Sequence, residues 1–372
     1  MRKIWIISIF CCSCYISEEV PPDQDIWDYD LPKNQQFNQN ELLLLDNRIK
    51  NDQDFGLIEG LTIIRNRKLI FENYYFNIPG RSHEKNLGRT GLTITLAALG
   101  VAIDQRLISV EDSIYKYLPE YDVIFQSDPA KLGITIRDVL MHRTGLSWNE
   151  NIEDLYIFGN DSLIPNPMNN LIQMKESDDW VEFVLSRPLV GIGFYSFSTA
   201  NGVLLAKILE NATGVDFNTY VNEEIFSPLS INHSSIEQDA FGNFNGGDGY
   251  TLSLLDLSKI GYLYLNEGIW KGRTLLNTNF IRDAITRQHQ FSQSGFENSI
   301  GYFWTFFGPG YGNSLGVEYN NIVFLVGELG QSIFIVPEEN MVVTILSDNY
   351  FGINVQSVNL FAEITRATSQ LE

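Results

Sequence analysis

The stretch TGLTITLAALGVAI, from Thr90 to Ile103, is apolar on nearly every side and is followed by one charged residue, Asp104. An apolar run of this length without a polar stripe is typical of a helix that is buried all round. Gly91 and Gly100 remove side chains where neighbouring elements can approach closely. The stretch therefore predicts a buried helix at the centre of a domain.

Strand patterns lie toward the two ends of the chain, and helical patterns lie between them. Near the N-terminus, Glu41–Ile49 has helical spacing, and Leu57–Phe76 alternates as two strands around the turn Arg65–Lys68. Near the C-terminus, three strands and a closing helix are expected at Ile322–Val326, Ser332–Val336, Val342–Leu346 and Val355–Ala367. Further helices are expected at Ile134–Met141, Leu204–Glu210 and Leu254–Leu265. We therefore predict an α/β (α+β) fold, in which helices flank an antiparallel sheet made by both chain ends and an all-helical region is inserted at about residues 105–265.

The N-terminus has the features of a secretory signal peptide over residues 1–13. Two basic residues precede the apolar run Ile4–Phe10, which is too short to span a bilayer but suits a signal sequence. Ser13 before Cys14 resembles a bacterial lipoprotein cleavage site, which makes Cys14 the expected lipidated residue. A plain signal peptide with incidental cysteines is the alternative.

An acidic tether is expected over residues 14–30, because Ser17–Asp25 is rich in carboxylates and contains proline. It resembles the acidic stretches of surface-exported lipoproteins, and one domain is expected over residues 31–372. All three cysteines precede the domain, so none is left for a disulfide within it. We expect a protein secreted across the inner membrane and anchored by lipid in the bacterial envelope or on the cell surface.

The composition restricts the class of partner. Hydrophobic residues make up 44% of the chain and charged residues 19%, which is the balance of a globular protein. A net charge of −21 argues against nucleic acid and against an anionic membrane surface as partners, because both require a basic face. Contact with a membrane is therefore expected only through the lipid anchor.

Several blocks of sequence resemble the β-lactamase-related serine hydrolases, the family of class C β-lactamases, penicillin-binding-protein-like carboxypeptidases and esterases, and nylon-oligomer hydrolases. The blocks are Gly100–Asp104, Ile108–Asp112, Tyr117–Tyr121, Ile134–Leu140, Arg143–Trp148, Leu204–Glu210, Lys259–Asn266 and Gly330–Pro337. The resemblance covers Trp27–Asn349 and implies a β-lactamase/transpeptidase-like fold. It also implies the chemistry of acyl transfer, which the individual residues must support.

The positions that carry this chemistry in the family are replaced. A nucleophilic serine opens the family's central helix, and a lysine one turn later accepts its proton. Counting back from Gly100 without a gap, those two positions hold Arg89 and Leu92. The tyrosine that passes the proton to the leaving group corresponds to Phe197, and the cation of the third motif corresponds to Glu328. The resemblance therefore implies that no catalytic set is intact.

Three substitutes for the missing groups need to be considered. Tyr195 would supply the tyrosine hydroxyl if the alignment shifts by two residues, and the alternative is an aromatic cluster. A literal S-x-x-K occurs at Ser82–Lys85, in a polar loop where a chance match is favoured. Thr90 and Thr93 carry hydroxyls near the helix start but have no lysine or histidine one turn later, so a capping role is favoured.

Other chemistries find little support in the sequence, and no cofactor or metal is expected. The histidines have no metal-ligand spacing, and His142 is favoured as a structural polar residue; the four are His83, His142, His233 and His289. Gly246–Gly249 is rich in glycine but lacks the strand-to-helix context of a phosphate loop.

Two functions remain as hypotheses. The favoured one is a pseudoenzyme, an envelope-anchored binding or scaffold protein that holds a small molecule, peptide or glycan in the family's cleft. The alternative is a serine hydrolase that acts on an amide, ester or β-lactam through relocated residues. Arg89 and Glu328 have opposite charges at positions that face each other in this fold, so they are expected either to form a bidentate ion pair or to turn separately to solvent.

Overall fold

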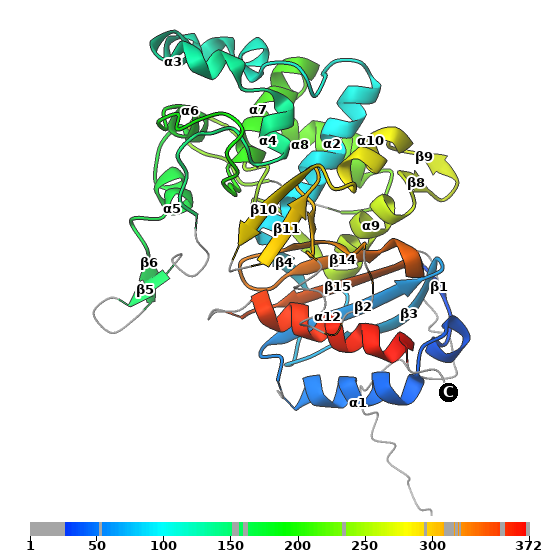
Figure 1. The fold of residues 1–372 in the computed structure, drawn as a ribbon. Helices are drawn as coiled ribbons and strands as arrows, with labels where there is room; N and C mark the ends of the chain where they lie inside the picture. The colour runs from blue at the N-terminus through cyan, green and yellow to red at the C-terminus, as the bar shows by residue number, and fades with distance from the viewer. Residues whose placement is uncertain are drawn as a thin grey trace, which may run out of the picture.

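The computed structural model describes residues 27–369, apart from 52–53, 151–155, 159–162, 233–235, 294–295, 309–315, 317–318, 320 and 350–353. The predicted signal peptide, Cys14 and His233 lie outside the described residues. Helices cover both faces of a nine-stranded sheet, and a mainly helical region lies beyond one of these faces (Figure 1). This arrangement confirms the predicted α/β (α+β) class.

Both ends of the chain contribute to the sheet, as the sequence predicts. The strand order is β1-β3-β2-β15-β14-β13-β12-β11-β10, and every pair is antiparallel except β1 with β3. The strands are β1 (Asp28–Tyr29), β2 (Ile58–Arg65), β3 (Lys68–Tyr74), β10 (His289–Gln293), β11 (Phe296–Ile300), β12 (Thr305–Phe306), β13 (Val323–Val326), β14 (Ser332–Val336) and β15 (Met341–Ser347). The sheet therefore places the N-terminal hairpin β2–β3 directly beside the C-terminal strand β15.

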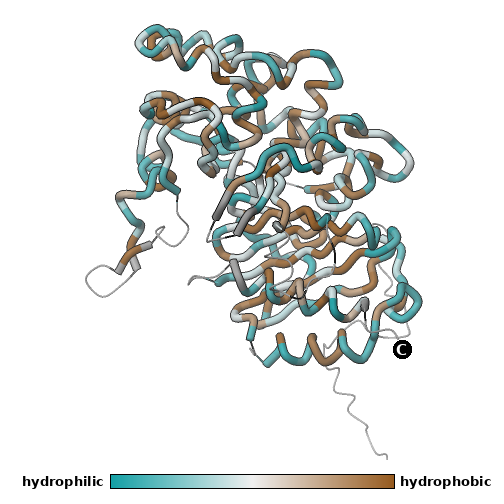
Figure 2. Tube along the Cα trace, in the orientation of Figure 1, coloured by the Kyte–Doolittle hydropathy of each residue, from teal (hydrophilic) through white to brown (hydrophobic). Residues whose placement is uncertain are grey.

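Alternating side chains of the sheet point to opposite faces and pack into two apolar cores. In β15, Val343 and Ile345 pack toward α1 (Gln39–Lys50) and α12 (Asn354–Ser369), while Val342 and Leu346 belong to the larger core on the other face. The helix α9 (Leu254–Leu265) covers that second face and contacts β2, β14 and β15. Figure 2 shows the apolar colour following the strands between these helices. The second core continues from the sheet into the helical region.

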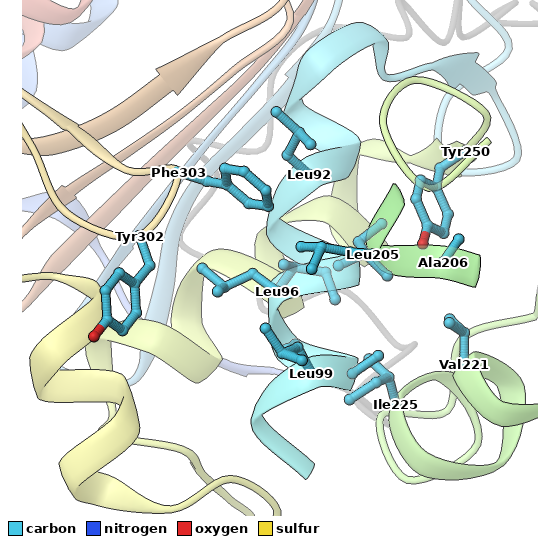
Figure 3. Packing of buried hydrophobic residues seen from close by; sticks show 14 of the residues in the cluster. Leu92, Leu96, Leu99, Leu205, Ala206, Val221, Ile225, Tyr250, Tyr302 and Phe303 are labelled. Carbon is cyan, nitrogen blue, oxygen red and sulfur yellow. The ribbon is translucent and has the colours of Figure 1, made fainter. Parts of the chain in front are cut away.

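The predicted central helix is α2 (Leu92–Asp104), preceded by a 3₁₀ turn at Gly88–Gly91. All residues from Leu92 to Ala102 are buried, which confirms the prediction drawn from the apolar run. Figure 3 shows Leu92, Leu96 and Leu99 of α2 among Leu205, Ile225 and Phe303 from other elements. The helix is therefore held by packing on several sides, and its N-terminal end leads into the polar 3₁₀ turn.

The inserted region contains short helices and also strands that were not expected there. Its helices are α3 (Asp122–Ser127), α4 (Ile136–Leu140), α5 (Asn170–Lys175), α6 (Trp180–Leu185), α7 (Asn201–Thr213) and α8 (Phe217–Val221), with α10 (Thr278–Ala284) following. The small strand pairs are β4 (Glu84–Asn86) with β7 (Thr251–Ser253), β5 (Tyr156–Phe158) with β6 (Leu163–Pro165), and β8 (Ile269–Trp270) with β9 (Arg273–Thr274). The expectation of an all-helical insertion was therefore wrong in detail, since β5, β6 and β7 lie inside it.

The fold also begins earlier than the expected boundary at residue 31. Trp27 is buried and meets the rings of Tyr262 and Trp270 edge to face, at centroid distances of 5.2 and 5.4 Å. Asp28 and Tyr29 form β1 beside β3. Residues 27–30 therefore belong to the domain rather than to the tether, because the aromatic ring of Trp27 finds apolar partners far along the chain. Among the described residues, no helix is both long and apolar enough to cross a membrane.

Candidate functional site

Arg89, which the resemblance predicts at the position of the family's nucleophile, lies in the 3₁₀ turn directly before α2. The preceding chain is fixed by two hydrogen bonds: Leu87 N–H donates to the carbonyl of Tyr250 (2.9 Å), and Gly88 N–H donates to the side chain of Asn86 (2.8 Å). Gly88 has a positive φ of 52°, and a Cβ there would overlap the carboxylate of Glu328. Only glycine therefore permits this close approach without strain.

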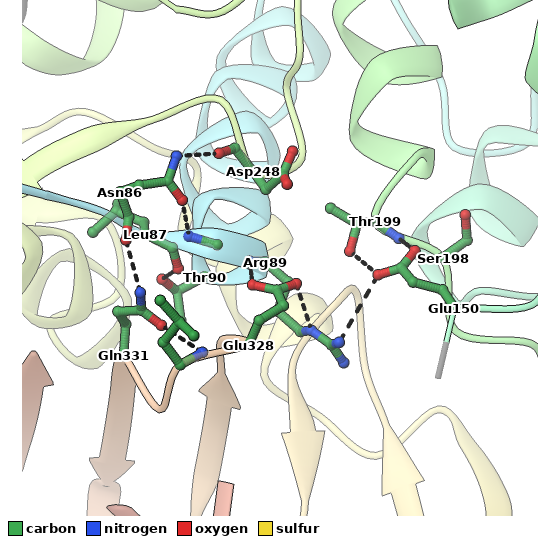
Figure 4. Close-up of polar contacts among 12 residues, drawn as sticks. Asn86, Leu87, Arg89, Thr90, Glu150, Ser198, Thr199, Asp248, Glu328 and Gln331 are labelled. Carbon is green, nitrogen blue, oxygen red and sulfur yellow. Dashed lines mark hydrogen bonds and ion pairs between the residues drawn. The ribbon is translucent and has the colours of Figure 1, made fainter. Parts of the chain in front are cut away.

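Glu328 binds Arg89 through both of its carboxylate oxygens (Figure 4). The side-chain Nε of Arg89 donates to Oε1 at 3.1 Å, and the backbone N–H of Arg89 donates to Oε2 at 3.0 Å. The predicted contact between the two charges is present, but one of its two hydrogen bonds comes from the backbone instead of the guanidinium. Glu328 lies in the turn between β13 and β14, which are interior strands, and not on an edge strand.

Two further side chains surround the guanidinium of Arg89. Its central carbon lies 4.3 Å from the ring centroid of Phe197, the residue predicted at the family's tyrosine position, in cation–π geometry. Its Nη2 lies 3.9 Å from Oε1 of Glu150 and, among the described residues, is buried without a hydrogen-bond partner. The Arg89 side chain is only 9% exposed and that of Glu328 only 11%, so the charges face one another and not the solvent.

Glu150 is the one acidic residue of this cluster that is fully buried. Its carboxylate accepts hydrogen bonds from Thr199 N–H (2.7 Å), from the Thr199 hydroxyl and from the indole N–H of Trp148 (2.8 Å). Burial raises the pKa of Glu150 to about 7, although the positive charge of Arg89 acts in the opposite direction. Sequence analysis did not identify Glu150. The only available signal was its place two residues after the family block that ends at Trp148.

The remaining hydroxyls and side chains near the helix start do not form a nucleophile and base. Leu92 is fully buried in the core. The Thr90 hydroxyl donates to the carbonyl of Leu87 at 2.6 Å, and the Thr93 hydroxyl donates to the carbonyl of Thr90 at 2.7 Å. Both hydroxyls therefore bond back to carbonyls of the preceding turn. Neither threonine caps the helix by accepting from a backbone N–H, so the predicted capping role is wrong.

The literal S-x-x-K segment is arranged differently from a catalytic pair. The ammonium of Lys85 donates to Glu59 at 3.0 Å and to Asp348 at 2.8 Å. Within the described residues, no hydrogen bond joins Ser82 to Lys85. The lysine is therefore engaged with two carboxylates and not with the serine.

Tyr195 belongs to an aromatic cluster. Its ring stacks on Phe291 with a centroid distance of 4.1 Å and an interplanar angle of 17°. Burial raises the pKa of Tyr195, and in the described part of the chain no hydrogen bond links its hydroxyl to Ser82 or Thr90. The aromatic-cluster alternative describes these contacts better than a substitute proton carrier does.

His142 is a neutral hydrogen-bond acceptor inside the protein. Its Nδ1 accepts from Ser198 N–H at 3.2 Å and from the side-chain amide of Asn201 at 3.1 Å. Burial, assisted by the charge of Arg89, lowers the pKa of His142 to about 3. The residue therefore helps to hold the segment that carries Phe197 and Thr199, the role that the sequence favours for it.

The glycine-rich turn at Gly246–Gly249 serves close backbone packing. Gly202 approaches the backbone of Gly246, and Gly247 approaches the backbone of Thr199, so closely that a Cβ on either glycine would overlap it. Gly91 packs against the same turn. A Cβ atom on Gly91 would lie only 2.6 Å from the carbonyl oxygen of Gly247. These contacts explain the glycines without a phosphate ligand.

A profile of the beta-lactamase family matches residues 93–354, which is more than half of the chain. Solved structures of low sequence identity share the fold. A Bacillus anthracis protein assigned as a 6-aminohexanoate-dimer hydrolase is 17% identical, with a TM-score of 0.70 over 93% of this chain and 88% of that one. A penicillin-binding protein homologue from Caulobacter crescentus is 14% identical, with a TM-score of 0.65 over 88% and 98%. A class C beta-lactamase from Rhodobacter sphaeroides is 15% identical, with a TM-score of 0.60 over 87% and 98%.

The chain therefore belongs to the beta-lactamase family, whose members in these comparisons include serine hydrolases. No curated protein gave a significant sequence match. The matched range begins directly after Arg89–Leu92, the segment in which the resemblance predicts the positions of the family's nucleophile and base. Membership settles the fold, whereas the chemistry depends on the site residues described above.

Proposed function

We propose that this chain is a non-catalytic member of the beta-lactamase family that acts as an envelope-anchored binding or scaffold protein. One observation carries the proposal: Arg89 at the nucleophile position is held by Glu328 through both its guanidinium and its backbone amide. An acyl substrate would have to displace this pair before it could approach the start of α2.

The contact with the backbone amide bears directly on acyl transfer. Enzymes of this kind use backbone N–H groups beside the nucleophile to stabilise the oxyanion of the transition state. Here the N–H of Arg89 donates to a carboxylate oxygen of Glu328 instead. A negative charge already at this place would repel a developing oxyanion. Leu92 also supplies no base. The reaction would therefore lack its nucleophile, its base and its oxyanion site at the same time.

The alternative of a hydrolase with relocated residues has less support. It requires a hydroxyl within hydrogen-bond reach of a base. Thr90 donates to a backbone carbonyl, Lys85 is bound by two carboxylates, and Tyr195 is stacked on Phe291. Within the described residues these groups do not combine into one site.

The test is covalent labelling of the mature protein. We expect no mass increase after incubation with a fluorophosphonate or a labelled penicillin, measured by intact-mass spectrometry beside a class C β-lactamase as positive control. The variant with Arg89→Ser, Leu92→Lys and Glu328→His together is the smallest set of changes from which we expect labelling, whereas Arg89→Ser alone should stay unlabelled. An adduct on the unaltered protein would overturn the proposal.

Anchoring is tested separately, because it depends on Cys14 and not on the domain. We expect a clickable fatty acid supplied to the cells to label the unaltered protein and to be absent from Cys14→Ala. A variant that keeps the label, or an unaltered protein that never gains it, would remove the anchor from the proposal and leave the binding role to be judged on its own.

A further inference from the structure

A cavity of about 300 Å³ lies beside β1, β4 and the start of α9, and none of its lining residues belongs to the cluster around Arg89. Aromatic residues line it at the start of the described chain: Tyr29 lies in β1, and Trp27 directly precedes this strand. The ring of Trp27 is fixed by its contacts with Tyr262 and Trp270, so this wall is rigid.

One charged pair at the cavity is already neutralised within the protein. Lys259 is 1% exposed, and its ammonium donates to Asp256 at 2.6 Å and to the carbonyl of Ser230 at 2.9 Å. The other oxygen of Asp256 accepts from the Ser253 hydroxyl at 2.8 Å. A ligand would therefore meet a bound ion pair here and not an available ammonium.

The second cation at the cavity is engaged in the same way. Arg81 donates to the two oxygens of Glu72 through Nε at 2.7 Å and Nη2 at 2.6 Å, and Nη2 also contacts the Tyr29 hydroxyl. This bidentate arrangement satisfies the guanidinium. Neither cation of the cavity is consequently left to attract an anion.

Three other lining side chains are not engaged in this way. Among the described residues, the Glu84 carboxylate, the Asn232 amide and the Ser230 hydroxyl take part in no hydrogen bond or ion pair, although all three residues line the cavity. Ser230 also has a positive φ of 53°, which is uncommon for a residue other than glycine and is found at functional sites. Together these groups offer several acceptors and donors but only one uncompensated charge.

We infer that this cavity binds a neutral, hydroxyl-rich ligand, namely a sugar unit of a glycan. Hydroxyl groups both donate and accept, so they can satisfy Glu84, Asn232 and Ser230 at once, while the aromatic wall can face the C–H groups of a sugar ring. Glu84 would repel an anion, and the bound cations Arg81 and Lys259 offer an anion no counter-charge. A cationic ligand would meet only the single carboxylate of Glu84 and would leave Asn232 and Ser230 unmatched. The volume is at the lower end of ligand pockets, which span roughly 300–1,000 Å³, and so suits about one ring.

The experiment uses saturation-transfer NMR and calorimetry on the full chain. The neutral probes are glucose, galactose and N-acetylglucosamine, and the charged probes are inorganic phosphate and putrescine. We expect at least one sugar to bind with a Kd on the order of 1 mM and both charged probes to bind more weakly. Glu84→Gln and Asn232→Ala alter exposed side chains, so both variants should keep the melting temperature and weaken sugar binding roughly tenfold each.

Two controls separate this inference from the proposed function. Asn279→Ala removes an exposed amide that lines a different cavity and should leave sugar binding unchanged. Arg89→Leu with Glu328→Leu alters the replaced catalytic position and should also leave it unchanged, whatever the labelling experiment shows. The inference fails if no sugar binds, if phosphate or putrescine binds more tightly than the sugars, or if Glu84→Gln and Asn232→Ala bind sugar as the unaltered chain does.

Discussion

The helix α2 and the turn before it are stabilised in different ways, although they are adjacent in the sequence. Along Leu92–Ala102, every side chain is buried among apolar neighbours that come from many elements. At Arg89, by contrast, a buried cation is matched by Glu328, Phe197 and Glu150, which come from three separate segments. The core can be built from interchangeable apolar residues, whereas the cluster requires particular partners.

This difference supports the proposal that a structural cluster replaces the family's catalytic position. Loss of the nucleophile alone would have left a small residue such as alanine or glycine in an otherwise familiar site. Instead, Arg89, which is predicted at the nucleophile position, contacts both Glu328 and Phe197, which are predicted at the third-motif and tyrosine positions. The polar cluster therefore behaves as a structural unit that closes the start of α2, and the predictions below test it against the core.

The largest effect is expected in the core, from Leu96→Asp. Leu96 is fully buried, so the variant loses its apolar contacts and introduces a charge without a partner. We expect a loss of about 5 kcal/mol or more in the free energy of unfolding, comparable with the total stability of many domains. Circular dichroism during thermal and urea unfolding measures it. Val123→Asp on α3 is the control, since Val123 is 80% exposed and should change stability little; equal melting temperatures for the two variants would contradict the buried helix.

Elements with a strong local pattern could be predicted with their boundaries. The helix α9 and the strand β14 begin and end at the predicted residues, because each has an uninterrupted apolar period and a clear flanking signal. The strands β10 and β12 were not predicted. β10 reads HQFSQ, with a single apolar residue, and β12 has only two residues. Both segments are therefore strands because they pair with neighbouring strands, and not because of their own sequence.

The candidate site could be predicted only where a family register was available. Arg89 and Glu328 were found by counting from blocks of this chain that resemble the family, and their opposite charges indicated the contact. Glu150 could not be found, because its relation to Arg89 and Thr199 exists only after distant segments have folded together. The burial of Trp27 was missed for the same reason, since its aromatic partners are Tyr262 and Trp270.

The second largest effect is expected from Glu328→Ala in the polar cluster. Removing the carboxylate leaves the buried guanidinium of Arg89 without its main partner, which should lower the free energy of unfolding by about 3 kcal/mol. Replacing both charges, with Arg89→Leu and Glu328→Leu together, should cost less than the sum of the single changes. Chemical unfolding of the single and double variants measures this coupling.

An exposed ion pair provides the matched control for that cycle. Glu111 pairs with Arg137, and its side chain is 66% exposed. Glu111→Ala should therefore cost only ~0–1 kcal/mol, as surface pairs do. If Glu328→Ala costs no more than Glu111→Ala, the cluster around Arg89 is not a structural unit and the contrast with the core fails.

The last effect is expected from Glu150, is no larger than that of Glu328→Ala, and appears as a dependence on pH. Burial raises the pKa of Glu150 in the folded protein to about 7, above its ordinary value of 4.5, so the folded state binds this proton more tightly than the unfolded state does. The resulting stabilisation is complete below pH 4.5 and is lost as the pH rises through about 7. Its size should be at most about 3 kcal/mol.

Glu150→Gln cannot titrate, so the stability of the unaltered protein minus that of the variant should fall between these two pH values and stay flat outside them. Urea unfolding across this range measures the difference, and Leu96→Ala, which removes no titratable group, should give no such slope. A flat difference for Glu150→Gln would mean that Arg89 keeps the carboxylate of Glu150 charged in the folded protein at all these pH values. The cluster would then be a network of three charges, and not one ion pair beside a protonated acid.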